Sequence, residues 1–176
     1  SIASTGGFST KNLSIGYFDS DIINIVAMVF MTVSAMHFGL IYSVFATRSL
    51  KPLNKSVIKF YLGSLVVISV VVMVSLMING EYDSWGRAWL DASFNVVSYM
   101  STTGFAICDN STWPLLAGVM LMIGALQCGC SGSTTGGLKV DRILISFKTI
   151  RYEIRRRLHP SAVSHVTLSG HHLPDS

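Results

Sequence analysis

Two long stretches without a single Asp, Glu, Lys or Arg constrain this chain more than any other feature of its sequence. Ile22 to Ala46 contains none over 25 residues, and Phe60 to Ile78 contains none over 19. A helix that crosses the hydrocarbon core of a bilayer needs about 20 apolar residues. Only 12% of the 176 residues are charged, against about 25% in a soluble domain. The chain is therefore predicted to be an all-α integral membrane protein.

The charged residues are segregated along the chain, and their distribution predicts its orientation. Basic side chains gather between the two apolar runs and in the later part of the chain: Arg48, Lys51, Lys55, Lys59, Lys139, Arg142, Lys148, Arg151, Arg155, Arg156 and Arg157. Asn79 to Thr112 instead carries four acids and one arginine. The positive-inside rule places the basic regions in the cytoplasm and the acidic stretch outside. Orientation within a lipid bilayer explains these charges more simply than a nucleic-acid partner, which we do not expect.

Two short loops of nearly the same sequence each lie next to an apolar segment. Ser4-Thr5-Gly6-Gly7-Phe8 and Ser101-Thr102-Thr103-Gly104-Phe105 share four of five positions. Non-helical backbone at membrane depth is tolerated only inside protein or along a water-filled cavity. Glycine permits positive φ, which lets successive carbonyls point the same way, and a ring of carbonyls can replace the water shell of a cation. One copy could equally be an ordinary outer turn, but the repeat favours a pore lining.

The segment before the second loop is predicted to be an amphipathic helix. Trp85 to Met100 is too polar to span a bilayer and has about the length of a re-entrant helix. Its C-terminal end would direct the partial negative charge of the helix dipole towards Ser101, which suits a cation. The alternative is a helix that lies flat on the membrane surface, as Trp85 and Trp89 would allow.

The last apolar segment is predicted to be broken within the membrane. Trp113 to Leu126 would rise only about 21 Å of a core roughly 30 Å thick. Four glycines and several hydroxyl groups follow between Gln127 and Gly137, and such a run does not form a stable helix. The apolar pattern resumes at Leu138. The polar run would therefore face water or protein, on the cytoplasmic side of the loop at 101–105. The residues expected to form a gate there are Gly129, Ser131, Gly132, Ser133, Thr134, Thr135, Gly136 and Gly137.

Other patterns favour no additional chemistry. Gly132 to Lys139 is not a phosphate-binding loop, because Leu138 separates the glycine from the lysine and Val140 follows in place of Ser or Thr. Cys108 and the Cys128-Gly-Cys130 pair make neither a disulfide framework nor a metal site.

The histidines and the remaining polar residues suggest no catalysis. His37 lies mid-span and is a functional candidate by its depth, but a neutral histidine hydrogen-bonded between helices is the plainer interpretation. His171 and His172 do not make a metal site. No acid–base pair or nucleophile–base pair has a persuasive spacing, so an enzyme is not expected.

Four stretches together resemble a known family. They are Ser-Thr-Gly-Gly-Phe-Ser-Thr at 4–10, Ser-Thr-Thr-Gly-Phe at 101–105, Gly-Cys-Ser-Gly-Ser-Thr-Thr-Gly-Gly-Leu-Lys-Val at 129–140, and Arg-Leu-His-Pro at 157–160. The chain resembles the TrkH family, the membrane subunits of bacterial Trk potassium-uptake systems in the Trk/Ktr/HKT superfamily. The resemblance covers nearly all of the chain, and the Gly-rich run is its most specific part.

The resemblance implies a potassium-channel-like architecture of four successive units, each with an outer helix, a pore helix, a filter strand and an inner helix. Residues 1–47 would be the filter strand and inner helix of the second unit, and 48–59 a cytoplasmic linker. Residues 60–160 would be the third unit, with its outer helix at 60–78, pore helix at 85–100, filter at 101–105 and broken inner helix at 113–158. Residues 161–176 would be a cytoplasmic connector. On this basis we expect a fragment of a longer protein.

The same resemblance implies the transported ion and the partners. Potassium would be the substrate, held only by filter carbonyls and with no cofactor in this chain. The filter residues would be Thr5, Gly6, Gly7, Thr102, Thr103 and Gly104, with Gly7 and Gly104 in the place of the channel-filter glycine. The family implies a homodimer, a cytoplasmic nucleotide-binding regulatory subunit of the RCK/KTN type, and a multi-pass location in the bacterial inner membrane.

Two alternatives belong to other functional classes. A secondary carrier also uses discontinuous helices, but it would have one occluded site, and the repeated loop argues against it. A non-transporting membrane scaffold would tolerate changes at Gly7 or Gly104 without altered ion flux.

Overall fold

The computed structural model describes residues 1–11, 14–48, 56–158, 167–168 and 171–172. In this part of the chain the helices are η1 (Ile2–Ser4), η2 (Ser14–Phe18), α1 (Asp21–Ser34), α2 (Phe38–Thr47), α3 (Ser56–Ile78), α4 (Trp85–Met100), α5 (Leu115–Gln127) and α6 (Val140–Leu158). Two strands of two residues each, β1 (Thr167–Leu168) and β2 (His171–His172), pair antiparallel.

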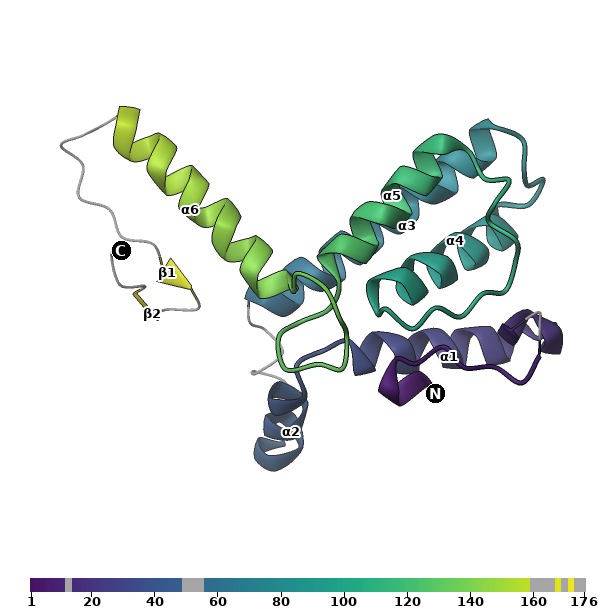
Figure 1. The fold of residues 1–176 in the computed structure, drawn as a ribbon, viewed down its shortest axis with the longest axis horizontal. Helices are drawn as coiled ribbons and strands as arrows, with labels where there is room; N and C mark the ends of the chain where they lie inside the picture. The colour runs from purple at the N-terminus through teal and green to yellow at the C-terminus, as the bar shows by residue number, and fades with distance from the viewer. Residues whose placement is uncertain (12–13, 49–55, 159–166, 169–170, 173–176) are drawn as a thin grey trace.

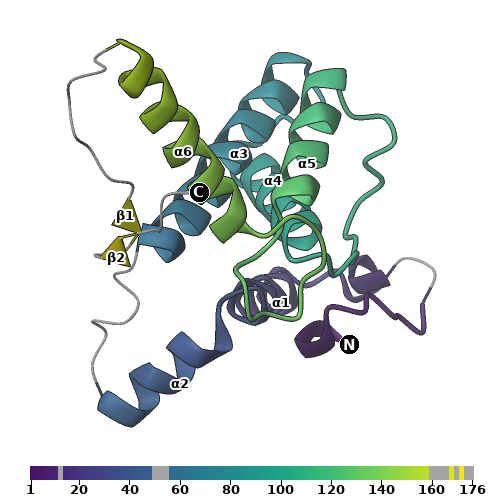
Figure 2. The same ribbon diagram turned by 60° about the vertical axis from the view of Figure 1, so that its left-hand side comes forward.

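Helices α3, α4 and α5 form the central group. α3 and α5 lie side by side, α4 packs against both, and α1 lies along the opposite side of α4 (Figures 1 and 2). α2 turns away from this group, and α6 diverges from α5 after contacting α3. The loop between α5 and α6 returns towards the junction of α1 and α2 (Figure 2).

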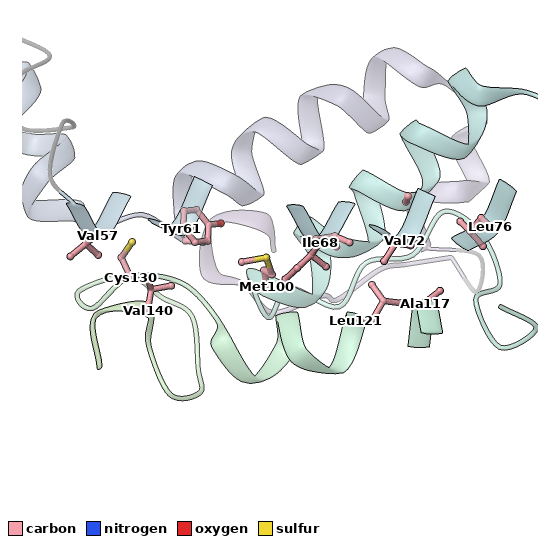
Figure 3. Close-up of a cluster of buried hydrophobic side chains, with 13 residues drawn as sticks. Val57, Tyr61, Ile68, Val72, Leu76, Met100, Ala117, Leu121, Cys130 and Val140 are labelled. Atoms are coloured by element: carbon pink, nitrogen blue, oxygen red, sulfur yellow. The ribbon is translucent and has the colours of Figure 1, made fainter. Parts of the chain in front are cut away.

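The core lies between the three central helices. α3 contributes residues four or seven apart, which is the spacing of one helix face. Figure 3 shows these side chains meeting those of α4, α5, the α5–α6 loop and the start of α6: Val57, Tyr61, Ile68, Val72, Leu76, Met100, Ala117, Leu121, Cys130 and Val140. This packing fixes the C-terminal end of α4, and with it the position of the second loop.

One helix buries a polar face while two others expose apolar faces, which is unusual in a water-soluble protein. The buried face of α4 includes Asp91, Ser93, Asn95 and Ser98. The outward faces of α3 and α5 are aliphatic: Leu62, Val66, Val67, Val70, Val74, Ile78, Leu115, Leu116, Val119, Met122, Ile123 and Leu126 are exposed. An aliphatic exterior with polar groups buried on α4 suits hydrocarbon rather than water.

α3 is the one helix among the described residues that is by itself long and apolar enough to span a membrane. It has 23 residues, and α1 with α2 would count as a second, bent span. α5 is also apolar but shorter. These assignments rest on length and composition.

The expected single helix from Ile22 to Ala46 is wrong, because α1 and α2 meet at an angle of 96°. At the break, the Ala35 carbonyl accepts a hydrogen bond from Cys130 N at 2.9 Å, and Phe38 N donates to the Gly132 carbonyl at 3.2 Å. Backbone groups that a continuous helix would pair internally are therefore paired with the Gly-rich loop. This partner lies far away in sequence, so the apolar run did not reveal the break.

His37 lies at this break rather than inside a continuous helix. Its Nδ1 accepts a hydrogen bond from Gly39 N at 3.0 Å and caps the N-terminus of α2. The described bond is thus local, and the expected hydrogen bond between helices is not the one that is observed.

Other boundaries differ by a few residues. α3 begins at Ser56, so the end of the expected 48–59 linker is helical, whereas 49–55 lie outside the described residues. The helix-ending Pro160 and most of the expected connector at 161–176 also lie outside them. α5 begins at Leu115, with Pro114 at its N-cap. α4 covers Trp85–Met100, the residues of the predicted amphipathic helix, but its role as a pore helix stays a prediction.

Candidate functional site

The two similar loops share an alternating backbone conformation. Thr5 and Gly7 have φ of 49° and 62°, and the equivalent Thr102 and Gly104 have φ of 53° and 79°. The residue between them, Gly6 or Thr103, has negative φ in each loop. When left-handed and right-handed residues alternate, successive carbonyls can point to one side of the chain, as a cation-binding backbone requires.

The two loops lie against each other. A Cβ atom on Gly7 would overlap the Thr103 carbonyl oxygen, so only glycine fits at this contact. Just beyond the loops, Gly16 N donates to the Ala106 carbonyl at 3.2 Å. Ala106 N donates in turn to Ser14 Oγ at 3.3 Å, across 92 residues of sequence. The fold thus brings together both groups of residues predicted as a filter.

The last turn of α4 holds the second loop in shape. Ser98 Oγ donates to the Phe105 carbonyl at 2.7 Å, and Thr103 N donates to the Ser98 carbonyl at 3.0 Å. The hydroxyl groups of Ser101 and Thr103 share a buried hydrogen bond of 2.7 Å. The negative end of the α4 dipole is therefore next to residues 101–104, where it stabilises positive charge.

A polar network at the other end of α4 was not predicted from the sequence. Buried Asp91 accepts a hydrogen bond from Tyr82 at 2.8 Å through Oδ2, while its Oδ1 lies 3.4 Å from Arg87 Nε, too poorly aligned for a hydrogen bond. Arg87 also donates to Asp21 of α1 at 3.0 Å. The network links α4 to α1 and to the preceding loop. No periodic signal pairs Tyr82 with Asp91, because a turn of the chain separates them.

The network continues to Cys108, in the segment that follows the second loop. Asn95 Nδ2 donates to Cys108 Sγ at 3.3 Å and to the Asp91 carbonyl at 2.9 Å. Burial raises the pKa of the Cys108 thiol above its usual value, and the negative charge of Asp91 raises it further, against a lowering by the Asn95 hydrogen bond. Burial and the hydrogen bond to Asp91 also raise the pKa of Tyr82, which keeps it a donor.

The Gly-rich loop is fixed at its base by backbone hydrogen bonds. Besides the contacts with the α1–α2 break, Val140 N donates to the Gly129 carbonyl at 3.0 Å. Ser131 N donates to Asp141 Oδ2 at 2.5 Å, at the start of α6. Gly137, with φ of 77°, packs against the Cys128 side chain. The loop therefore closes on itself between the ends of α5 and α6.

The tip of the same loop contacts both filter-like loops. Thr5 Oγ1 donates to the Thr134 carbonyl at 3.1 Å, and Gly136 N donates to Thr102 Oγ1 at 3.1 Å. Thr135 is buried between these two contacts and shares a 2.8 Å hydrogen bond with Ser133. The eight predicted gate residues thus lie in one loop, and its tip meets the predicted filter.

Two hollows flank the paired loops. One of about 700 Å³ lies beside the first loop and is lined by Ile2, Phe8, Phe30 and Phe105 among others. The other, of about 310 Å³, is lined by Thr102, Gly104, Tyr99 and Asn110 among others. Among the described residues, no atom lies within 4 Å of a Cβ built on Gly104, so this glycine faces open space.

Comparison with known proteins identifies the family. The model of the TrkH family, described as a cation transport protein, matches residues 1–176. The chain belongs to the TrkH family. The Trk system potassium uptake protein TrkH of Salmonella typhimurium is 39% identical over 171 residues, which cover 97% of this chain and 35% of the relative. Its counterpart in Halomonas elongata is 37% identical over 180 residues, covering 99% of this chain and 36% of the relative.

A solved structure agrees with this TrkH assignment. The crystal structure of the potassium transporter TrkH from Vibrio parahaemolyticus matches with a TM-score of 0.91 and 35% identity, over 98% of this chain and 38% of that one. The predicted resemblance is thereby confirmed, as is the expectation of a helical membrane protein of a cation-transport family. The chain spans about 35% of the length of the relatives from Salmonella and Halomonas.

Proposed function

We propose that this chain forms part of a potassium-uptake pore in the bacterial inner membrane, with two of its filter strands at residues 5–7 and 102–104. The observation that carries the proposal is the contact between two loops of like sequence and like alternating φ. Carbonyls of Thr5, Gly6, Gly7, Thr102, Thr103 and Gly104 would replace water around a dehydrated K⁺. The potassium-uptake names of the relatives support the choice of ion.

The surroundings of the loops support a filter made of more than two strands. Gly104 faces open space and lines the hollow of about 310 Å³ beside the second loop. Further strands, from the parts of the longer relatives that this chain does not match, would complete a ring around the ion. In this arrangement α3, α4 and the α5–α6 pair are the outer, pore and broken inner helices of one unit, and the whole protein crosses the membrane several times.

The Gly-rich loop is the proposed gate. It contacts both filter loops at its tip and is held at its base by the α1–α2 break and α6. Closure would place its backbone across the cytoplasmic end of the ion path, and opening would require the tip to move. Ion passage through such a pore would need no cofactor and no catalytic step.

The proposed partners follow from the family and from charge. A cytoplasmic nucleotide-binding subunit of the RCK/KTN type would control the gate, and two copies of the membrane subunit would form a dimer. α6 ends with Arg155, Arg156 and Arg157. Such a basic end suits the cytoplasmic side of the membrane and an acidic surface on a partner.

Substitution of Gly104 by Ser in the full-length protein tests the filter. A side chain at φ of 79° strains the backbone and displaces the carbonyls, so K⁺ over Na⁺ selection in reconstituted vesicles should fall. Gly80→Ser is a matched control, because Gly80 has φ of 73° and equally open surroundings among the described residues but lies at the end of α3. Equal selectivity in both variants would contradict a filter role for Gly104 and favour a scaffold.

A further inference from the structure

We infer that Thr5 and Thr102 are positioning residues that hold the gate loop closed against the filter, through their side-chain hydroxyl groups. We call these two contacts, Thr5 Oγ1 to the Thr134 carbonyl and Gly136 N to Thr102 Oγ1, the threonine clamp. The inference rests on the proposed function, because it assigns a regulatory role to residues of the proposed filter.

The first observation is the equivalence of the two threonines. Each stands three residues before the Phe of its loop, and each has a left-handed backbone, with φ of 49° at Thr5 and 53° at Thr102. That conformation is unfavourable for a β-branched residue. Thr5 and Thr102 thus occupy the same strained position in their loops, and the hydroxyl group of each contacts the tip of the Gly-rich loop.

The second observation is that the contacts bracket the tip of the gate loop. They fall on Thr134 and Gly136, on either side of buried Thr135. The threonine hydroxyl donates in one contact and accepts in the other, so a carbonyl and an N–H group of the tip are both paired. Thr134 and Gly136 are themselves exposed, so each contact stabilises this placement of the tip by no more than an ordinary neutral hydrogen bond, about 0.5–1.5 kcal/mol.

The remaining bonds of the loop hold its base, apart from bonds within the loop, in one of which Lys139 Nζ donates to the Thr135 carbonyl. Its base is bonded to Ala35, Phe38 and Asp141, and these contacts persist if the clamp is lost. The Thr134 hydroxyl also reaches the Ser34 carbonyl, but at a long 3.4 Å. Release of the clamp would therefore detach the tip from the two filter-like loops while the base stays attached, which is the motion that a gate requires.

The two halves of the clamp are unequal. The Thr5 hydroxyl group has one hydrogen, and its oxygen also lies 2.8 Å from the Ser4 carbonyl. The Thr102 oxygen accepts from an N–H group that has a single acceptor in the described structure. Loss of the Thr102 hydroxyl should therefore have the larger effect.

Rubidium uptake by vesicles containing the full-length protein, without its regulatory partner, tests the clamp. Thr102→Val removes the hydroxyl and keeps the shape, and it should raise flux about threefold to tenfold, the range set by one neutral hydrogen bond. Thr5→Val should give a smaller rise, and Thr102→Ser should restore the low flux. Thr112→Val, in the outer segment, is the control and should match the unmodified protein.

The same substitution in a loop-shortened protein separates a clamp from a direct filter effect. With residues 131–136 shortened there is no tip to release, so Thr102→Val should cause no additional rise in flux. An equal rise in both backgrounds would overturn the clamp and assign the effect to ion binding in the filter. An unchanged flux on the intact background would also overturn it.

Amide hydrogen exchange supplies a measurement that does not depend on transport. In detergent, Thr102→Val should speed exchange in the 131–137 segment, with Thr112→Val unchanged. Faster exchange in a protein that carries no rubidium would retain the clamp and reject the proposed function. Unchanged exchange in a protein that transports rubidium would reject the clamp and retain the pore.

Discussion

At the residue scale, each of the paired loops has two residues with positive φ, of which only the glycine adopts that conformation easily. Gly7 and Gly104 reach positive φ without steric cost, whereas Thr5 and Thr102 reach it as β-branched residues, against a cost of about 1–2 kcal/mol each. Strain of this kind clusters where a binding site or switch over-determines the backbone. The threonine contacts with the gate loop give a reason for retaining hydroxyl side chains there.

Cys108 provides a residue-scale prediction with a defined sign. Because burial and the charge of Asp91 raise the pKa of this thiol, little thiolate forms near neutral pH, and alkylation should be slow. The rate should rise with pH through a midpoint above the usual thiol value of about 8.5. Asp91→Asn removes a charge that raises the pKa, so it should move the midpoint to lower pH and speed the reaction at pH 8. Mass spectrometry of the Cys108 peptide measures both; a midpoint at or below about 8.5 in the unmodified protein would contradict the buried setting.

At the element scale, helix content was readable from the sequence, but the break between α1 and α2 was not. Charge-free length and amphipathic spacing predict the helical stretches at α3 and α4, because both signals are local. The groups that end α1 and begin α2 bond to Cys130 and Gly132, nearly 100 residues further along. The Asp91 network was hidden for the same reason. The α1–α2 break and the Asp91 network both depend on contacts that form only in the folded chain. No local sequence pattern predicts such contacts.

The hydrogen bond from Tyr82 to Asp91 is expected to stabilise the packing of α4 against the preceding loop. Tyr82→Phe leaves a buried carboxylate oxygen without its donor, which should destabilise the folded protein by about 1–3 kcal/mol. Tyr99→Phe is the matched control, since its hydroxyl pairs with Asn110 at an exposed site, and it should cost less than about 1 kcal/mol. Thermal unfolding in detergent compares the two. A Tyr82→Phe protein as stable as the control would remove this network from the account of α4.

At the scale of the whole molecule, polar side chains are buried on α4 while aliphatic side chains are exposed on α3 and α5, and two loops nearly 100 residues apart in the sequence are in contact. The sequence identified the residues of the candidate filter and gate through repetition and glycine content. It did not show that the Gly-rich loop bonds to both Thr5 and Thr102, because side-chain contacts between segments have no sequence period. It also did not predict the contrast between Phe105, which is 6% exposed, and Phe8, which is 86% exposed. Phe105 packs against α1 and α4 in the second hydrophobic cluster, whereas Phe8 lines the hollow beside the first loop.

The central claim is that the paired loops conduct potassium selectively. Its most direct test is rubidium uptake into liposomes that contain the full-length protein and its cytoplasmic partner, with sodium as the competing ion. The account predicts uptake that excess potassium suppresses and excess sodium leaves nearly unchanged. Absence of rubidium flux in folded protein, or equal suppression by sodium and potassium, would contradict a potassium filter at Thr5–Gly7 and Thr102–Gly104.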